Sequence, residues 1–205
     1  MPLQNRVTPF GDLFATPARG LLMGNRGGRL HDDARALGTR RWASKQWICC
    51  VLDFHGRHRN VWGEGYTELF FLDEVTAIAA GHRPCFECRH RDAIHFATLF
   101  SGKSRRATAG AMDDALHTER LDGQAKRLHR REIATLPDGA MIVRDRAAFA
   151  VRGKTLLHWT PAGYDASRPR LRTGLVDVLT PPAMLNVLAR GYAPQWHATA
   201  ATPPA

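Results

Sequence analysis

Hydrophobic positions divide the chain into short apolar runs, which predict strands, and segments with one apolar face, which predict helices. Residues 46–54 and 68–72 are mainly apolar, as expected for buried strands. A helix is predicted directly after the second run, because Asp73 can accept the unpaired N–H groups of a first turn and Gly81 can end the helix. Residues 1–45 contain many turn signals and little periodicity, so this segment is expected to be rich in turns.

The downstream half shows both patterns again. Helices are predicted where apolar residues recur at helical spacing, over 88–101 and 109–121. Strands are predicted over 147–151, 154–159 and 175–179. Arg152-Gly153 is expected to form a hairpin turn between the first two of these strands. Thr180 is expected to cap a last helix, with Pro181 at its first position.

The charge of the chain points to polyanionic partners. Its 205 residues include 29 Lys and Arg against 19 Asp and Glu, a net charge of +10 with histidine neutral. Such a basic balance favours nucleic acid as a partner, although charge alone is equally compatible with a basic protein of another kind. The 44% hydrophobic content excludes a wholly disordered chain.

The sequence predicts no membrane contact. No stretch approaches the about 18 consecutive apolar residues that a membrane span requires. The N-terminus lacks the apolar core of a signal peptide, and four cysteines are too few for a secreted disulfide framework. A cytoplasmic location is therefore expected, while the oligomeric state stays open.

The sharpest chemical motif is Cys85-Phe-Glu-Cys88. Two cysteines at this spacing can direct both sulfurs at one ion, and two histidines would complete the tetrahedral site that Zn²⁺ prefers. His55 and His58 are the predicted partners, because they lie on a charged turn after a strand. Three alternatives stay open: His82 as a ligand, Cys49 or Cys50 as a ligand from the core, and a redox role for the pair.

Residues 69–89 resemble a known family. The progression Ala-Ala-Gly-His-Arg-Pro-Cys-Phe-Glu-Cys-Arg is similar to the metal-binding domain of the Ada DNA-repair protein, over about residues 46–92 of this chain. The resemblance implies a small α/β unit that holds structural zinc and binds DNA. Cys85 and Cys88 match that family's downstream cysteine pair, and His55 and His58 lie near the place of the upstream pair. Because the upstream pair is absent, the resemblance argues against methyl transfer.

These features predict an α+β fold with a small mixed sheet, helices and a zinc knuckle, as a single compact domain or two small lobes. The predicted parts are a turn-rich N-terminal segment, an Ada-like zinc-binding unit, a basic helix followed by a β-hairpin and a C-terminal helix, and a disordered tail. Their bounds are 1–45, 46–102, 103–197 and 198–205.

A second group of reactive side chains predicts a hydrolytic centre. Glu119 and Asp122 could hold Mg²⁺ or Mn²⁺ near a phosphate, His117 could act as the base, and Lys126 could stabilise developing charge. The alternative is an exposed, charged helix end without catalytic function.

Two basic segments are predicted to contact nucleic acid through phosphates, with Trp42 stacking on an exposed base. Their residues are Arg40, Arg41, Trp42, Lys45, Lys126, Arg127, Arg130 and Arg131. The sequence thus predicts a zinc-containing nucleic-acid-binding protein, with DNA favoured over RNA, that acts as a nuclease or repair hydrolase in DNA damage. A non-catalytic zinc regulator and a redox or metal sensor are the alternatives.

Overall fold

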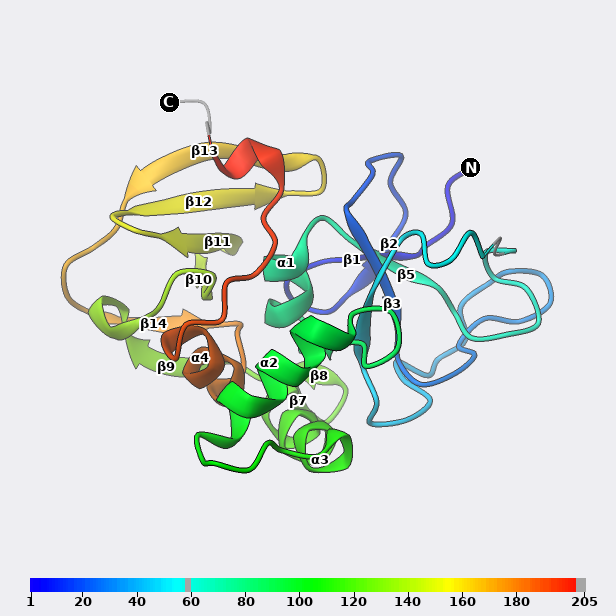
Figure 1. The fold of residues 1–205 in the computed structure, drawn as a ribbon. Helices are drawn as coiled ribbons and strands as arrows, with labels where there is room; N and C mark the ends of the chain where they lie inside the picture. The colour runs from blue at the N-terminus through cyan, green and yellow to red at the C-terminus, as the bar shows by residue number, and fades with distance from the viewer. Residues whose placement is uncertain (58–59, 202–205) are drawn as a thin grey trace.

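The computed structural model describes residues 1–57 and 60–201. These residues form two six-stranded sheets, a two-stranded hairpin and four α-helices in one compact arrangement (Figure 1). The predicted class, a mixture of helix and sheet, is confirmed. Within the described residues the longest helices have 12 residues, and none is long and apolar enough to cross a membrane.

The first sheet is mixed and comes from the N-terminal part of the chain. Its strand order is β2-β1-β5-β3-β4-β6. The strands are β1 (Arg6–Val7), β2 (Leu13–Phe14), β3 (Leu22–Asn25), β4 (Ile48–Val51), β5 (Leu69–Phe71) and β6 (Arg83–Pro84). Strand β6 runs parallel to β4, with Cys49 opposite Pro84.

Strand β3 lies in the interior of this sheet, in the segment that the sequence describes only as turn-rich. Its four residues are all buried. Gly24 allows the close approach to β4, because a Cβ there would lie 2.0 Å from the carbonyl oxygen of Ile48. Glycine is a poor strand former. The residue that allows this close approach therefore also weakens the strand pattern in the sequence.

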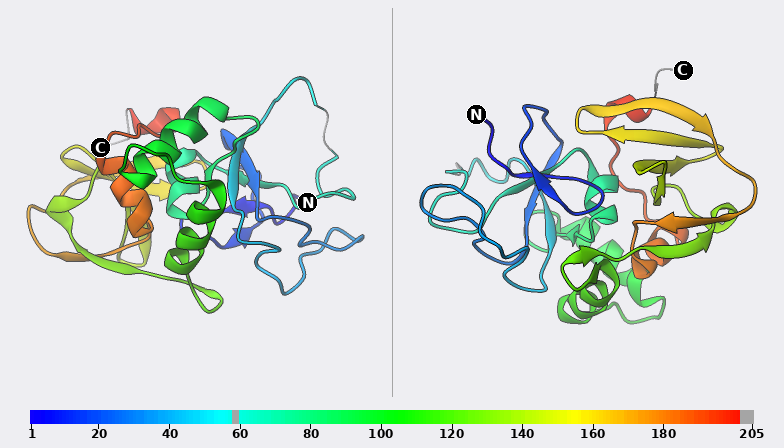
Figure 2. Two further views of the ribbon diagram at one scale, coloured as in Figure 1. Left: turned by 60° about the horizontal axis from the view of Figure 1, so that its bottom comes forward. Right: turned by 180° about the vertical axis from the view of Figure 1, so that it is seen from behind.

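The second sheet is antiparallel, with strand order β13-β12-β11-β10-β14-β9. The strands are β9 (His129–Glu132), β10 (Met141–Arg144), β11 (Ala147–Arg152), β12 (Thr155–Thr160), β13 (Gly163–Pro169) and β14 (Leu175–Val178). The predicted hairpin is present, but its turn is Gly153-Lys154 because Arg152 still pairs with Thr155. Figure 2 shows the two sheets from two further directions.

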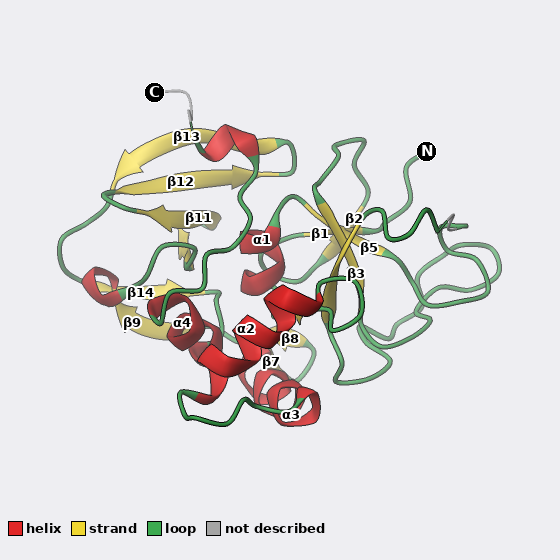
Figure 3. Ribbon diagram, viewed as in Figure 1, coloured by secondary structure: helices red, strands yellow, loops and turns green. Residues whose placement is uncertain are grey.

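Helix α1 (Glu74–Ala79) lies between the two sheets (Figure 3). All six of its residues are buried. Val75 packs with Met141 of the second sheet, while Ala77 packs with Phe71 of the first. On its remaining side Ile78 packs against α2 (His90–Ser101), α3 (Ala109–Arg120) and α4 (Pro182–Ala189). This short helix is therefore the centre of the core.

The predicted cap of α1 is confirmed. Asp73 accepts a hydrogen bond from the Thr76 backbone N–H at 2.9 Å. Its second oxygen accepts from the Tyr164 hydroxyl at 2.8 Å and from the His197 backbone N–H at 3.1 Å. The same carboxylate thus connects the helix to the second sheet and to the C-terminal segment. Burial raises the pKa of this carboxyl group.

Two predictions about the C-terminal region differ from the structure. Thr180 does not cap α4, since its hydroxyl accepts the Met141 backbone N–H at 2.9 Å, and Pro181 precedes the first helical residue. The expected disordered tail begins as a short 3₁₀-helix, Ala198–Ala200, whose last residue is buried in the core. Residues 202–205 lie outside the described part of the chain.

Candidate metal centre and basic surface

Three thiols meet beside the first sheet. The sulfur atoms of Cys50, Cys85 and Cys88 all lie within 4.8 Å of one another. Cys50 is on β4, and Cys85 directly follows β6, which is the parallel neighbour of β4. The Cys85 backbone N–H donates to the Cys49 carbonyl at 2.9 Å, so strand pairing itself brings Cys85 beside Cys50.

The alternation of side chains along β4 separates its two cysteines. Cys50 packs with Met23, Cys85 and Cys88, whereas Cys49 lies in the core with Leu22. Neighbouring residues on a strand point to opposite faces, so only one of them can join the thiol group. The sequence interpretation kept Cys49 or Cys50 as one alternative, and the structure selects Cys50.

Backbone donors support the sulfur of Cys85. The Glu87 backbone N–H lies 3.4 Å from this sulfur, as in a metal-binding knuckle. Hydrogen bonds from the Cys50 and Cys88 thiols, followed by the backbone donors, lower the pKa of Cys85. Hydrogen bonds to the other two sulfurs, together with burial, raise the pKa of Cys50. This polarisation favours a thiolate at Cys85, the form that binds metals.

Arg89 links the turn that carries Cys85 and Cys88 to the core. It forms ion pairs with Glu74 of α1 at 2.8 Å and with Asp92 of α2 at 2.6 Å. Glu74 is buried and also accepts from the Tyr192 hydroxyl at 2.6 Å. The turn that carries Cys85 and Cys88 is thereby held in a fixed position, as a preorganised ligand set requires.

The structure assembles part of the predicted zinc ligand set. Among the described residues, the only group of three or more His, Cys, Asp or Glu side chains gathered closely enough to share an ion is the thiol trio. His55 is exposed and lies outside this group, and His58 falls outside the described residues. His82 is buried elsewhere, where its Nε2 accepts from Arg26 at 3.4 Å.

The donor set fits a soft metal ion. A tetrahedral zinc with Zn–S bonds of about 2.3 Å has its sulfurs about 3.8 Å apart. The three cysteine sulfurs, which all lie within 4.8 Å of one another, are close enough for this geometry. Thiolates select zinc and other thiophilic ions over Mg²⁺ or Ca²⁺. The three close cysteines can therefore bind a metal ion, with a fourth position left for another ligand.

The predicted catalytic side chains have separate partners. Glu119 accepts the Ala183 backbone N–H at 2.8 Å, at the start of α4. Asp122 is exposed and lies 3.6 Å from Arg127. Lys126 donates to the Ala79 carbonyl at the end of α1, and His117 lies 3.2 Å from an Arg120 nitrogen. Each of these four groups thus contacts a different partner, and Glu119 accepts a hydrogen bond at the start of α4.

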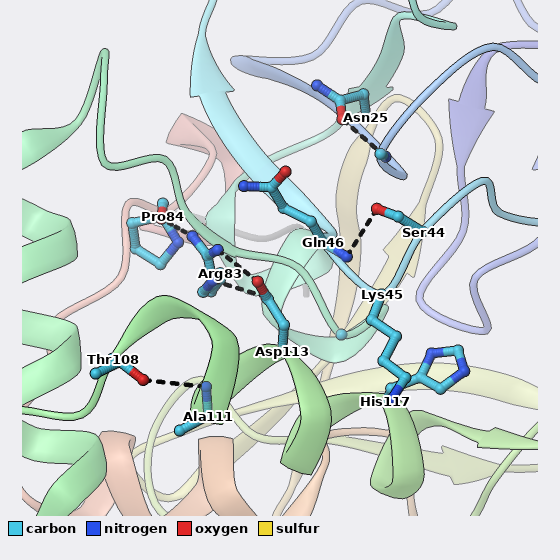
Figure 4. Close-up of polar contacts among 12 residues, drawn as sticks. Asn25, Ser44, Lys45, Gln46, Arg83, Pro84, Thr108, Ala111, Asp113 and His117 are labelled. Atoms are coloured by element: carbon cyan, nitrogen blue, oxygen red, sulfur yellow. Dashed lines mark hydrogen bonds and ion pairs between the residues drawn. The ribbon is translucent and has the colours of Figure 1, made fainter.

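The two predicted nucleic-acid segments meet on one surface. Arg41 donates to the Gln124 carbonyl at 2.6 Å, in the hairpin of β7 (Leu121–Asp122) and β8 (Ala125–Lys126). The Trp42 ring lies against the edge of His117 at 5.4 Å. Lys45 pairs with Asp114 at 2.8 Å and lies close to His117 (Figure 4). We call residues 40–45 together with His117 and residues 122–127 the basic surface.

The remaining predicted contacts lie beside this surface or continue from it. Arg40 is exposed, and Arg127 donates to the Leu121 carbonyl at 2.8 Å. Arg130 and Arg131 are exposed on β9. Sequence reasoning missed the cations beneath the surface, Arg26 and Arg120, because buried arginines leave no periodic pattern in a sequence.

No protein family, curated protein or solved structure matches the chain.

Proposed function

We propose that the chain is a zinc-containing nucleic-acid-binding protein that favours DNA over RNA. The observation that carries this proposal is the meeting of residues 40–45 with the hairpin after α3, where Arg41 bonds the Gln124 carbonyl. Two cationic segments that are about 80 residues apart in sequence then present their charges to the same partner. A phosphate backbone is the partner that such an arrangement fits best, because its charges are closely and regularly spaced.

The side chains of this surface suit both parts of a nucleotide. Arg40 and Lys45 are exposed and free to approach phosphates, although Lys45 also pairs with Asp114. Trp42 is partly exposed and rests on His117, which leaves part of the indole available for stacking on a base. The resemblance of residues 46–92 to a DNA-binding zinc domain supports DNA as the preferred partner.

Zinc at Cys50, Cys85 and Cys88 would be structural in this proposal. The ion would join β4, the segment after β6 and the turn before α2, three parts of the chain that already meet through backbone pairing and packing. The fourth ligand would be water or a histidine of the loop after β4, where the sequence predicts His55 and His58.

Hydrolysis is not part of the proposal. The side chains predicted to bind a catalytic Mg²⁺ or Mn²⁺, Glu119 and Asp122, contact different partners. A nuclease needs its metal ligands and base around one scissile phosphate. The arrangement supports the non-catalytic alternative, a zinc protein that binds DNA without cleaving it and without transferring a methyl group.

Fluorescence anisotropy with a labelled DNA duplex, single-stranded DNA and RNA of the same sequence tests this function. The double variant Arg40→Gln/Arg41→Gln removes two charges from the basic surface. Lys154→Gln/Arg172→Gln removes two exposed charges from the second sheet and its adjoining loop, and is the matched control.

We expect the first variant to weaken DNA binding and to reduce the slope of log K against log salt by up to about 0.9 for each lost contact, while the control keeps the wild-type slope. Equal affinity of both double variants would contradict the proposed surface. Absence of salt-dependent binding to any of the three nucleic acids would contradict the function.

A further inference from the structure

A group of buried cations surrounds Trp47 beneath the basic surface. The guanidinium carbons of Arg26 and Arg120 lie 3.9 and 4.0 Å from the centre of the Trp47 ring. Both arginines are almost completely buried, at 0% and 1% exposure. His82 stacks near the same indole, with ring centres 4.9 Å apart. We call these four residues, with the neighbouring Lys126, the Trp47 cluster.

The carboxylates of this region are paired with other cations. Asp113 binds Arg83, Asp12 binds Arg41, and Asp114 binds Lys45. In the described part of the chain no carboxylate forms a hydrogen bond or ion pair with Arg26, Arg120 or Lys126. These three side chains bond only backbone carbonyls and imidazole nitrogens. The Trp47 cluster thus holds three cationic side chains without a bonded counter-charge.

The end of α1 offsets only part of this charge. Lys126 and Arg120 donate to the carbonyls of Ala79 and Gly81, at and just beyond the C-terminus of the helix. A full helix terminus is equivalent to about half a negative charge. Asp113 acts on Arg120, and Asp12 acts on Arg26 and Lys126, only through space and without a bond, so positive charge remains in excess in the cluster. The effect is visible at Lys126, where burial and then the charges of Arg120 and Arg26 lower the pKa to about 7.

The same cluster lacks hydrogen-bond acceptors. Among the described residues, the buried side-chain nitrogens and oxygens without a partner are Trp47 Nε1, His82 Nδ1 and Arg120 Nε. His82 accepts from Arg26 through Nε2, so the proton of a neutral ring lies on Nδ1 and makes it a donor. All three unpartnered atoms are therefore N–H donors in one place. Buried donors without acceptors are costly, which indicates that an acceptor belongs there.

We propose that the Trp47 cluster is a binding site for a phosphate group. A phosphate supplies both missing features at once, negative charge and several strong acceptor oxygens. This site deepens the proposed function, on which the identification of the phosphate with a nucleic-acid backbone rests. Free inorganic phosphate has the same chemistry, so the two sources are separated by experiment.

The site is one layer of side chains below the protein surface. Trp42 lies between, with its ring 6.4 Å from Trp47 and 5.4 Å from His117, and both Trp42 and His117 are partly exposed. Arg41 and Lys126 form the rim, since the Arg41 carbonyl accepts from Arg26 and Lys126 is only partly buried. A phosphate that enters past Trp42 would contact the rim cations and bring its charge and acceptor oxygens to the unpartnered donors beneath them.

Isothermal titration calorimetry with inorganic phosphate tests the site, with ionic strength held constant by sodium chloride. The variant Lys126→Met removes a rim cation, and Lys154→Met removes an exposed cation of the second sheet as the control. We expect saturable binding to the wild-type protein, about tenfold weaker binding to Lys126→Met, and wild-type binding to Lys154→Met. Circular dichroism checks folding, and Arg41→Gln replaces Lys126→Met if that variant unfolds.

Anisotropy with labelled duplex DNA, with and without added phosphate, separates this inference from the proposed function. Competition by phosphate at constant ionic strength, lost in Lys126→Met, would support a backbone phosphate in the site. Saturable phosphate binding without any DNA binding would leave a free-phosphate site and remove the proposed function. DNA binding that is unchanged in Lys126→Met, with no saturable phosphate binding, would overturn the phosphate site and leave the proposed function intact.

Discussion

Arg83 and Asp113 form a buried, two-pronged ion pair between the strand that leads to Cys85 and helix α3. The Arg83 Nε and a terminal nitrogen each donate to a different Asp113 oxygen at 2.8 Å (Figure 4). The Arg83 side chain is 1% exposed and that of Asp113 is 10% exposed. The pair connects the strand before Cys85 to the helix whose end carries His117, and so links the two candidate sites.

Removal of one partner of this pair should be strongly destabilising. Asp113→Asn leaves the Arg83 charge buried without its counter-charge, and we expect the free energy of unfolding to fall by about 3–5 kcal/mol. Urea denaturation followed by circular dichroism measures the change. Asp114→Asn is the matched control, because the neighbouring residue forms an exposed pair with Lys45 and should change stability little. Equal effects of the two variants would contradict this assignment.

Serine substitutions should separate the two adjacent cysteines of β4. Cys50→Ser removes a sulfur from the thiol trio and should reduce bound zinc, whereas Cys49→Ser should retain the metal because Cys49 lies on the opposite face of the strand. Elemental analysis of protein purified without chelator gives the zinc content of each variant. Chelation should lower the unfolding temperature of the wild-type protein and have less effect on Cys50→Ser.

The two variants form a matched pair, because both cysteines are buried and each substitution replaces a thiol with a hydroxyl. Retention of zinc by Cys50→Ser and its loss from Cys49→Ser would show that the strand presents its other face to the metal. His58→Ala and His55→Ala then test the sequence prediction for the fourth ligand with the same measurement.

The features that sequence reasoning located well depend on neighbouring residues. The cap at Asp73 and the left-handed Gly81 after α1 are local, and so is the left-handed Gly102 that ends α2. The pair Cys85 and Cys88 is local in the same sense, because two residues between the cysteines suffice to bring their sulfurs together.

The features that it missed depend on contacts between distant segments. Cys50 joins Cys85 only because β4 and β6 pair in parallel, and no local pattern specifies that register. The sequence does not reveal the buried charges for a related reason. Arg26 and Arg120 read as surface residues in the sequence, and only the fold places both over Trp47.

Glu119 should act in stability and not in catalysis. Its carboxylate accepts the Ala183 N–H at the start of α4, so Glu119→Ala should lower the free energy of unfolding by about 1 kcal/mol, as loss of a helix cap does. Glu119→Gln keeps an acceptor oxygen and should be close to wild type in stability. Thermal unfolding monitored by circular dichroism distinguishes these variants.

A plasmid assay with Mg²⁺ or Mn²⁺ examines the catalytic alternative for the same residue. A metal ligand would lose its function in Glu119→Gln, because the amide lacks the negative charge that holds a hard cation. We expect supercoiled plasmid to behave identically with the wild type and with Glu119→Gln. Metal-dependent nicking by the wild type that disappears in a stable Glu119→Gln protein would contradict this prediction and support the hydrolase alternative.

Lys126 should make the stability of the protein depend on pH. Burial and the charges of Arg120 and Arg26 lower its pKa from 10.5 to about 7 in the folded protein. Between these values the unfolded chain binds more protons than the folded one, so the free energy of unfolding should rise with pH, by up to about 1.4 kcal/mol per pH unit.

Lys126→Met removes the titrating group, and the difference between its profile and that of the wild type isolates this contribution from other groups. Urea denaturation at a series of pH values, without added phosphate, gives both profiles. Parallel profiles would mean that Lys126 keeps its ordinary pKa, and the uncompensated charge around Trp47 would then be smaller than the structure indicates.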